Sequence, residues 1–571
     1  MSTDSSGTHG SGAATGVPSY PQEQMWLTDQ LLGSAAVSAP TMCVRVRGPF
    51  DVRAARRAVE AVVERHRVLR STFAMGEDGL TQRVASGAAL DHAVEDLAGG
   101  PPSRWRDACV REVRRGFDLR VDFPLRLRIY RLAEDDHVVL AVRHHIVGDG
   151  RSDEIFAEEF AANYRAFAEG RVPEPPPLRA DYLDYARRSR ERLTGDRLAG
   201  LVDGAVDALS GAARTIALPL DRPRPKRRTG PGDSFTLSLA PRVAEGVRDL
   251  AGRAGASPYM VLLALFRVLL WRRTGQANVA VAAPVESRTR AEWSGVIGCF
   301  LNTLLLPGEV SGEDSAAELA RREKFTLAEA FARQELPYAL LARRAPESVP
   351  RPEVMLTYQV DDQPTPALPG LEVEPIDLPG AGSQFDLMVK VIRDDPGLRV
   401  QCAYDDEIFD RGTVRSLMDQ YAALLEEAGS APDVPVGRLA AAAAIGSARP
   451  APPDPFGAEP IRVLAWSGDD AAEGGPEDPM QRMIAEAWTD LRLDAADVHR
   501  SLLESGGHSL TVARLATALS EATGLEVGVA DLFGHQTIAE QAVFLERLLG
   551  ERFAALDPEA TASVLTEIES K

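Results

Sequence analysis

The chain has 571 residues, of which 44% are hydrophobic and 26% charged, so it can build packed interiors and is not a disordered protein. Its length exceeds what one hydrophobic core serves and predicts about three to four domains, or fewer if the α/β units are large. The formal net charge of -20 disfavours nucleic-acid binding, because a phosphate backbone demands a basic surface.

The N-terminal part of the chain predicts an arm, a helix and a hairpin. Residues 1–16 are rich in Ser, Gly and Thr without the basic start or apolar core of a signal peptide, so we expect a flexible arm. Asp51 is expected to cap a helix that runs to about residue 66. Segments 125–132 and 138–142 predict two strands of a hairpin, and the second strand runs directly into a pair of histidines.

The middle of the chain predicts further helices and strands. Ser152 is a candidate N-cap for a helix over 153–169, which places a tight turn between this helix and the preceding strand. Segment 257–271 is the most apolar, but Arg267 interrupts it and it is shorter than the ~20 residues that a membrane span needs. We expect a buried core helix here, no membrane, and a buried strand at 279–283.

The composition changes near the C-terminus. Residues 441–476 are rich in Ala, Pro, Gly and Asp and are expected to form a linker. A small helical bundle is expected over 477–550, from three helical patterns at 480–491, 509–523 and 537–549. From residue 477 onward, 17 Asp and Glu stand against 7 Lys and Arg, so this module is acidic. The acidic tail at 551–571 is expected either to dock a partner or to fray.

The four cysteines lie far apart in the sequence, without a Cys-x-x-Cys pair. This spacing argues against a disulfide framework and against a thiolate metal site. We therefore expect a protein of the reducing cytoplasm.

Residues 144–150, with the sequence His-His-Ile-Val-Gly-Asp-Gly, carry the first candidate chemistry. Histidine can accept a proton from an attacking amine or hydroxyl near neutral pH. Successive residues of a strand point to opposite sides, so one of His144 and His145 is expected to face a substrate while the other packs. Asp149 could turn back against the backbone or meet a cation, and Gly150 allows close approach or a left-handed conformation. No third ligand stands at a zinc-site spacing, so a metal site is disfavoured.

This histidine string resembles the active-site motif of condensation domains in non-ribosomal peptide synthetases. Seven further segments resemble the other motifs of that family in order: SYPQEQMW at 19–26, RHRVLRSTF at 65–73, YLDYA at 182–186, IGCFLNT at 297–303, QELPY at 334–338, FDL at 385–387 and YDDEIFD at 404–410. The resemblance implies a two-lobed α/β fold like that of chloramphenicol acetyltransferase over 17–440. The N-lobe is expected at about 17–190 and the C-lobe at about 191–440.

The resemblance also implies roles for the site residues. His145 occupies the position of the catalytic histidine, with His144 beside it, and backbone amides near Gly150 could stabilise a developing oxyanion. Asp149 falls where the family has a structural aspartate that pairs with an arginine, and Arg288 occupies the position of that arginine.

Three positions bear on how closely this chain follows the family. Arg151 stands where many members have tryptophan, and Ser287 where glycine is common, so the acceptor side of the site could differ in shape. Asp153, which follows Ser152, favours condensation over epimerisation.

A second string, Gly-Gly-His-Ser-Leu at 506–510, offers a serine hydroxyl at a helix start. The helix amides and the helix dipole would favour a phosphodiester on Ser509, although a serine in such a position can simply cap a helix. Residues 478–550 resemble a peptidyl carrier protein, with Ser509 at the attachment site of 4'-phosphopantetheine. Ser505 is a departure, because the family usually has leucine there.

Together the two resemblances imply amide-bond formation between a donor acyl thioester from another protein and an aminoacyl group tethered on Ser509. A phosphopantetheinyl transferase, an adenylation enzyme acting in trans and an upstream donor carrier protein are the implied partners. Three alternatives stay open: an acyltransferase that makes esters, release of the chain onto a free amine, and a non-catalytic platform that recruits tailoring enzymes.

Overall fold

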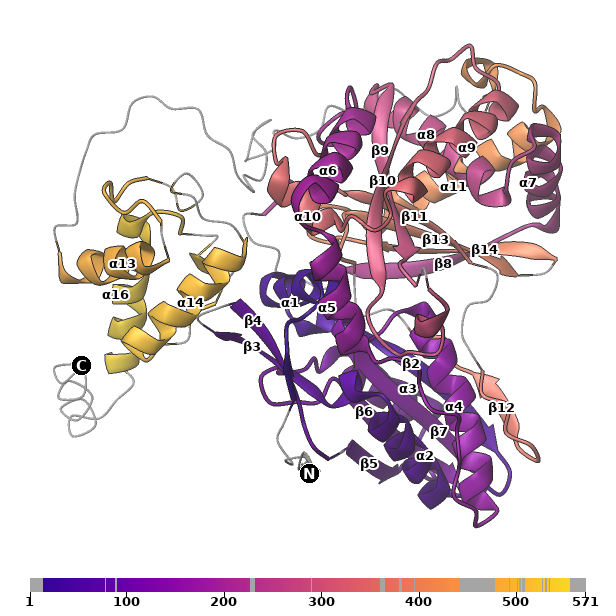
Figure 1. Ribbon diagram of the computed structural model, residues 1–571. Coiled ribbons are helices and arrows are strands. Elements are labelled where there is room, and N and C mark those ends of the chain that lie inside the picture. The colour runs from indigo at the N-terminus through magenta and orange to yellow at the C-terminus, as the bar shows by residue number, and fades with distance from the viewer. Residues whose placement is uncertain are drawn as a thin grey trace, which may run out of the picture.

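Figure 1 shows the structure of the protein, a computed structural model. It describes residues 14–76, 79–87, 90–225, 232–288, 290–359, 365–378, 383–394, 396–440, 478–491, 493–500, 502, 505, 509–525, 527–528, 531–532 and 535–554. The expected linker at 441–476, the tail beyond residue 554 and residues 506–508 lie outside these ranges.

The first part of the chain builds a five-stranded sheet in the order β12-β2-β7-β6-β5, antiparallel except for the pair β5 and β6. Its strands are β2 (Ser38–Arg47), β5 (Asp91–Asp96), β6 (Leu125–Ala133) and β7 (Asp136–His144), together with β12 (Glu372–Pro375) from later in the chain. The helices of this part are α1 (Tyr20–Leu32), α2 (Val52–Arg65), α3 (Pro102–Arg114), α4 (Gly150–Ala168) and α5 (Tyr182–Arg192). Helices α2 and α4 pack against each other beside the sheet (Figure 1).

Local sequence accounts for these elements. The hairpin expected at 125–142 is confirmed as β6 and β7. The helix expected after Asp51 is confirmed as α2, and the carboxylate of Asp51 accepts hydrogen bonds from the amides of Arg53 at 2.8 Å and Ala54 at 3.0 Å. Satisfying two free amides of the first turn in this way fixes where a helix begins.

A small three-stranded sheet, β1-β4-β3, stands apart from the large one. Its strands are β1 (Ala14–Gly16), β3 (Ser71–Gly76) and β4 (Gly79–Val84). The expectation of a flexible arm over 1–16 is therefore wrong for its last three residues, because β1 pairs antiparallel with β4. Such pairing depends on a partner strand about seventy residues away and leaves no local signal in a Ser/Gly-rich segment.

The second part of the chain builds a six-stranded sheet in the order β10-β9-β11-β13-β14-β8. Its strands are β8 (Asp233–Leu239), β9 (Asn278–Glu286), β10 (Leu301–Glu309), β11 (Val354–Gln359), β13 (Leu387–Asp394) and β14 (Gly397–Tyr404). Its helices are α6 (Gly195–Leu209), α7 (Pro241–Ala254), α8 (Pro258–Thr274), α9 (Ala316–Ala332), α10 (Tyr338–Arg344) and α11 (Arg411–Ser430).

The two faces of this sheet serve different cores. Strand β9 confirms the buried strand expected at 279–283, and its residues alternate between the faces as the pleat of a strand requires. Val279 and Val281 pack with α7, α8, α9 and α11, whereas Ala280 and Ala282 pack with α6 and α10. Helices thus cover both faces of the sheet (Figure 1).

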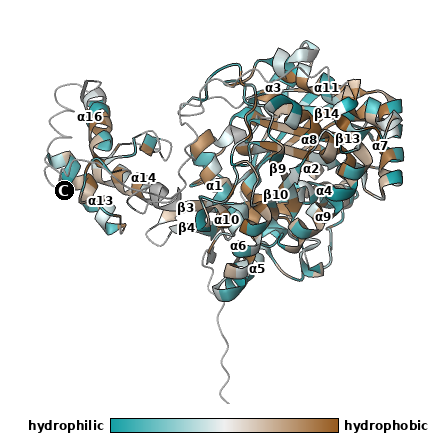
Figure 2. Ribbon diagram, turned by 90° about the horizontal axis from the view of Figure 1, so that it is seen from above, coloured by the Kyte–Doolittle hydropathy of each residue, from teal (hydrophilic) through white to brown (hydrophobic). Residues whose placement is uncertain are grey.

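Helix α8 is the buried core helix expected from its composition. Ser257 caps it by accepting from the amide of Met260 at 3.3 Å, and Pro258 is its first residue. In Figure 2 the hydrophobic colour gathers around α8 and the neighbouring strands. None of the helices in the described ranges is by itself long and apolar enough to cross a bilayer; α7 and α8 pass that test only as a pair bent by 103°.

One strand connects the two large sheets. Strand β12 (Glu372–Pro375) follows β11 of the six-stranded sheet in sequence but pairs antiparallel with β2, at the edge of the five-stranded sheet. Salt bridges from Arg47 to Glu372 at 2.9 Å and to Glu374 at 3.1 Å accompany this pairing. The expected boundary between an N-lobe and a C-lobe near residue 190 does not predict that residues 372–375 join the sheet of the N-lobe.

The three C-terminal helices confirm the helical patterns of the sequence. They are α13 (Pro479–Asp490), α14 (Ser509–Thr523) and α16 (Ile538–Ala554). They bury Trp488, Leu519 and Leu545, and the indole of Trp488 donates to Gln541 at 3.0 Å. Helix α14 lies beside β3 and α1, as both views of the ribbon show (Figures 1 and 2).

Candidate functional site

The histidine string forms a turn between β7 and α4. Strand β7 ends at His144, a short 3-10 turn spans His145–Val147, and α4 begins at Gly150. The expected N-cap Ser152 is wrong, because Asp149 caps the helix and accepts from the amide of Ser152 at 2.9 Å. The carboxylate reaches the free amide from three residues upstream, and it leaves Ser152 inside the first turn.

His144 is the histidine that packs. Its side chain is fully buried, its Nδ1 accepts from the amide of Ile146 at 3.0 Å, and its Nε2 lies 3.2 Å from Asp29 on α1. Because Nδ1 accepts, Nε2 is the donor to the carboxylate. Both ring nitrogens are therefore engaged within the protein.

His145 is the partly exposed histidine of the pair. Its Nδ1 lies 3.1 Å from Nη1 of Arg143, the last but one residue of β7. Burial, the Arg143 guanidinium and the neighbouring His144 lower the pKa of His145 from 6.5 to about 3, and a hydrogen bond with the Gly148 backbone opposes this shift only in part. The imidazole is consequently neutral at physiological pH.

Asp149 and Arg288 meet, at the distance expected for a structural ion pair. Nη1 of Arg288 donates to both carboxylate oxygens of Asp149 at 2.9 Å, and the amide of Phe300 donates to the same carboxylate at 2.9 Å. The Ser152 hydroxyl adds a further contact at 2.8 Å. These partners occupy the carboxylate and tie the histidine turn to the segment that precedes β10.

Gly150 is the first residue of α4 and is exposed. A Cβ at this position would meet nothing within 4 Å, and Gly150 is not among the described glycines with positive φ. The expected close approach or left-handed conformation is therefore not what glycine provides here. Its absence of a side chain leaves the N-terminus of α4 open.

Three family-like segments converge behind the turn. The Tyr182 hydroxyl lies 2.7 Å from the Ser19 hydroxyl and donates to the carbonyl of Cys299. A Cβ at Gly298 would fall 1.9 Å from the Tyr182 ring, so glycine is required there for space. Residues far apart in sequence thus form one support for the site.

Two contributors to the site were not foreseen from the sequence. Arg143 and Asp153 form a bidentate salt bridge, with Nε to Oδ1 at 2.7 Å and Nη2 to Oδ2 at 2.8 Å. The available signal was an arginine at the end of an apolar strand, because a buried charge demands a partner. Within the described ranges no group of three or more His, Cys, Asp or Glu could hold a metal ion.

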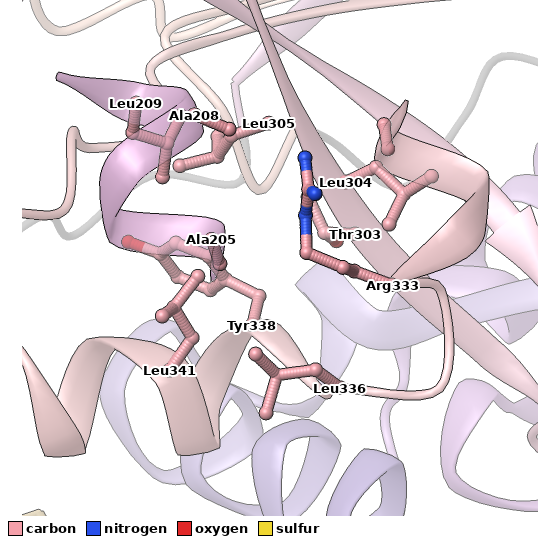
Figure 3. Close-up of a pocket in the computed structure, with 11 residues that line it drawn as sticks. Ala205, Ala208, Leu209, Thr303, Leu304, Leu305, Arg333, Leu336, Tyr338 and Leu341 are labelled. Atoms are coloured by element: carbon pink, nitrogen blue, oxygen red, sulfur yellow. The ribbon is translucent and has the colours of Figure 1, made fainter. Parts of the chain in front are cut away.

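Figure 3 shows a pocket that does not belong to this site. It lies between α6, β10 and α10, with Leu209, Leu305 and Tyr338 among its lining residues, and its volume is about 40 Å³. This is room for a few water molecules and not for an acyl chain. No residue of the histidine turn lines it.

Ser509 is the first residue of α14, as expected. A serine hydroxyl can be esterified, and the first-turn amides and dipole of a helix favour a phosphodiester at that end. The backbone at Ser509 therefore fits a phosphopantetheine arm.

Comparisons with known proteins agree with this architecture. Residues 17–444 match the Condensation domain family, and residues 482–545 match the Phosphopantetheine attachment site family. Ser509 lies within the second match.

Among curated proteins, the chain is similar to phosphinothricin tripeptide synthetase PhsB of Streptomyces viridochromogenes, with 34% identity over 487 residues. The match covers 81% of this chain but 39% of PhsB, so the chain spans well under half the length of that relative.

Two solved structures show the fold. The first condensation domain of the calcium-dependent antibiotic synthetase is 21% identical, with a TM-score of 0.64 over 75% of this chain and 99% of that one. The X-domain from teicoplanin biosynthesis is 24% identical, with a TM-score of 0.66 over 74% of this chain and 97% of that one. The expected chloramphenicol-acetyltransferase-like α/β fold, followed by a helical carrier region, is confirmed. The chain therefore belongs to the condensation-domain family of non-ribosomal peptide synthetases, with a phosphopantetheine attachment domain joined to its C-terminal side.

Proposed function

We propose that the chain forms an amide bond between a donor acyl group, delivered as a thioester by another protein, and an amine carried on its own Ser509. The observation that carries this proposal is the histidine turn. It holds one buried histidine and one partly exposed, neutral histidine at the end of β7. A neutral imidazole can hydrogen-bond to an attacking amine or to a developing oxyanion.

The contact between the carrier helix and α1 supports this proposal. Helix α14, which begins at Ser509, lies beside α1, and Asp29 of α1 contacts His144. When attached, the phosphopantetheine arm supplies a thiol that holds the acceptor as a thioester. We propose that Ser509 holds the arm and that residues 441–476 act as the linker that lets it move.

The proposed reaction balances without a further reagent. The amine nitrogen forms a bond to the carbonyl carbon of the donor, the bond from that carbon to sulfur breaks, and the departing thiolate gains the proton that the amine loses. His145 orients the reacting groups, and the amides at the start of α4 near Gly150 face the oxyanion.

The carrier domain requires a phosphopantetheinyl transferase and partner modules of a synthetase. We propose specifically that an adenylation enzyme loads Ser509 in trans and that an upstream carrier protein delivers the donor. In the reducing cytoplasm the cysteines, which the structure shows as free and buried at Cys43, Cys109, Cys299 and Cys402, would remain thiols.

The test combines arm attachment with transfer. A phosphopantetheinyl transferase and a panel of aminoacyl-coenzyme A substrates would charge Ser509 directly, and a panel of acyl N-acetylcysteamine thioesters would serve as donors. Intact-protein mass spectrometry is expected to show the arm, then one acyl group added to it. Ser509→Ala should abolish the arm, and His145→Ala should keep the arm but slow acyl addition about 100-fold. An arm that attaches but accepts no acyl group from any donor would contradict the proposal.

A second candidate function is a recruitment platform. The X-domain of teicoplanin biosynthesis shares the fold and was solved in complex with OxyB. The chain retains a neutral, partly exposed His145, which a platform does not need. Acyl transfer at the same rate in wild type and His145→Ala would favour the platform.

A further inference from the structure

Arg143 carries a charged side chain that is buried in strand β7. It follows the apolar run 138–142 of β7, and 3% of its side chain is exposed. Burying a guanidinium without partners costs several kcal/mol, so its contacts must be complete.

The guanidinium of Arg143 donates hydrogen bonds to three groups of the histidine turn and α4. Nε and Nη2 donate to Asp153, and Nη1 donates to the carbonyl of Gly148 at 2.9 Å and to Nδ1 of His145 at 3.1 Å. The Thr41 hydroxyl donates to the same Asp153 carboxylate. We call Arg143, Gly148 and Asp153 the arginine clamp.

Gly148 leaves the space that the guanidinium fills. A Cβ at Gly148 would lie 2.9 Å from Nε of Arg143 and 3.0 Å from its Cδ. The φ of Gly148 is -171°, which is extended backbone open to any residue, so glycine is needed for room and not for conformation. Arg143 and Gly148 are therefore a matched pair.

The clamp decides which nitrogen of His145 carries the hydrogen. A guanidinium only donates, so a hydrogen bond from Nη1 of Arg143 requires Nδ1 to accept and assigns the hydrogen of the neutral ring to Nε2. An Nε2 that already bears a hydrogen cannot take a proton from the amine.

We propose that Arg143 is a positioning residue that fixes His145 as a neutral Nε2–H donor, and that His145 acts by hydrogen-bonding to the thioester oxygen as it becomes an oxyanion. The amine proton then passes to the departing thiolate and not to the ring. This inference rests on the proposed function and names the chemical role of its central residue.

The direct test is nuclear magnetic resonance of the full-length protein with nitrogen-15 in its histidine rings. The His145 signals, assigned by their loss in His145→Gln, are expected to show a protonated Nε2 and a bare Nδ1 in wild type from pH 6 to 8. In Arg143→Met the ring should populate the Nδ1–H tautomer, and its pKa should rise because the facing cation is gone. A wild-type ring with Nδ1–H, or an unchanged ring in Arg143→Met, would overturn the inference.

Other titratable groups also lie near His145, so the variants must separate the effect of Arg143 from the effects of these groups. His144, which is bonded to Asp29, and Asp153, which is paired with Arg143, stay in place in Arg143→Met. Because that variant leaves Asp153 buried without its partner and could fail to fold, Arg143→Met/Asp153→Asn provides the folded alternative. The same change of tautomer is expected in both.

The matched pair gives an independent readout in the transfer assay. Gly148→Ala is expected to lower kcat about 10-fold or more in the wild-type background by displacing the guanidinium, with KM little changed. In an Arg143→Ala background the same substitution should change kcat less than about 2-fold, since the side-chain atoms that the added methyl group would meet are gone. Gly252→Ala, where a Cβ meets nothing within 4 Å, is the control. Equal effects of Gly148→Ala in the two backgrounds would refute the pairing.

The two proposals can fail separately. No transfer by wild type, together with the expected ring spectrum, would refute the amide function and the role of His145 toward the oxyanion, and would leave only the tautomer that Arg143 fixes. Transfer by wild type with an Nδ1–H ring would sink the clamp alone.

Discussion

At the scale of single residues, the site separates groups that hold it together from the group that is free to act. Asp149 is fully engaged by Arg288, Ser152 and Phe300, and His144 is engaged by Asp29 and Ile146. His145 has one ring nitrogen bound to Arg143. His145 is also the histidine of the pair that is partly exposed.

The Asp149 and Arg288 pair should dominate the stability of the turn. In Arg288→Met the buried carboxylate loses both of its charged contacts, and breaking a buried pair typically costs about 3 kcal/mol or more. Urea unfolding should show this loss. Arg151→Met is the matched control, since Arg151 makes partly exposed pairs with Glu154 and Glu158 that are worth about 1 kcal/mol or less. Similar midpoints for the two variants would contradict the assignment.

The low pKa of His145 predicts a pH dependence of stability. The folded state holds the ring neutral down to about pH 3, whereas the unfolded chain protonates it near pH 6.5. The unfolded state therefore binds more protons in this window, and stability falls as the pH drops from 6.5 toward 3. The fall in unfolding free energy between pH 7 and pH 5 should be smaller in His145→Gln than in wild type. An identical fall in both would show that the ring has its ordinary pKa.

At the scale of elements, local sequence signals predicted individual helices and strands but not the pairing of strands that are distant in the sequence. Helices α2, α8 and α14 and the β6–β7 hairpin follow from capping residues and hydrophobic spacing. The Ser152 cap failed because α4 already begins at Gly150, where the Asp149 carboxylate accepts from the amide of Ser152 and leaves that residue inside the first turn. Strands β1 and β12 pair with segments distant in sequence, and the contact of Arg143 with His145 depends on the geometry of the turn, so spacing alone did not reveal them.

Helix α8 contains a buried ion pair whose energetics can be isolated. Arg267 donates to Glu323 of α9 at 2.6 Å and to the carbonyls of Val279 and Leu306 at 2.7 and 2.8 Å. Glu323→Leu should destabilise the protein by about 3 kcal/mol, because an uncompensated charge stays in the core. The double variant Arg267→Met/Glu323→Leu should recover most of that loss in urea unfolding. No recovery would show that the pair contributes through packing.

At the scale of the whole molecule, the chain joins a condensation domain to an attachment domain for its own substrate arm. Tethering replaces a bimolecular encounter by an effective concentration of about millimolar. This organisation matters only if the arm on Ser509 serves the histidine turn of the same chain.

Mixing two full-length variants tests that tethering. His145→Ala carries a working arm and Ser509→Ala carries a working histidine turn, so any rate above that of His145→Ala alone comes from reaction between molecules. At about 10 μM this excess rate should be about 100-fold below the rate of wild type, and it should rise in proportion to concentration. A mixture as fast as wild type would show that reaction within one chain has no advantage.

The central claim is amide formation on Ser509, and rapid-quench analysis of the arm-bound product tests it most directly. Wild-type protein charged with an aminoacyl arm and mixed with an acyl thioester donor should yield, after release from the arm, an N-acyl amino acid that survives mild base. His145→Ala should yield it about 100-fold more slowly. An arm that still carries only the free amino acid after mixing, or a base-labile ester as the sole product, would contradict the account.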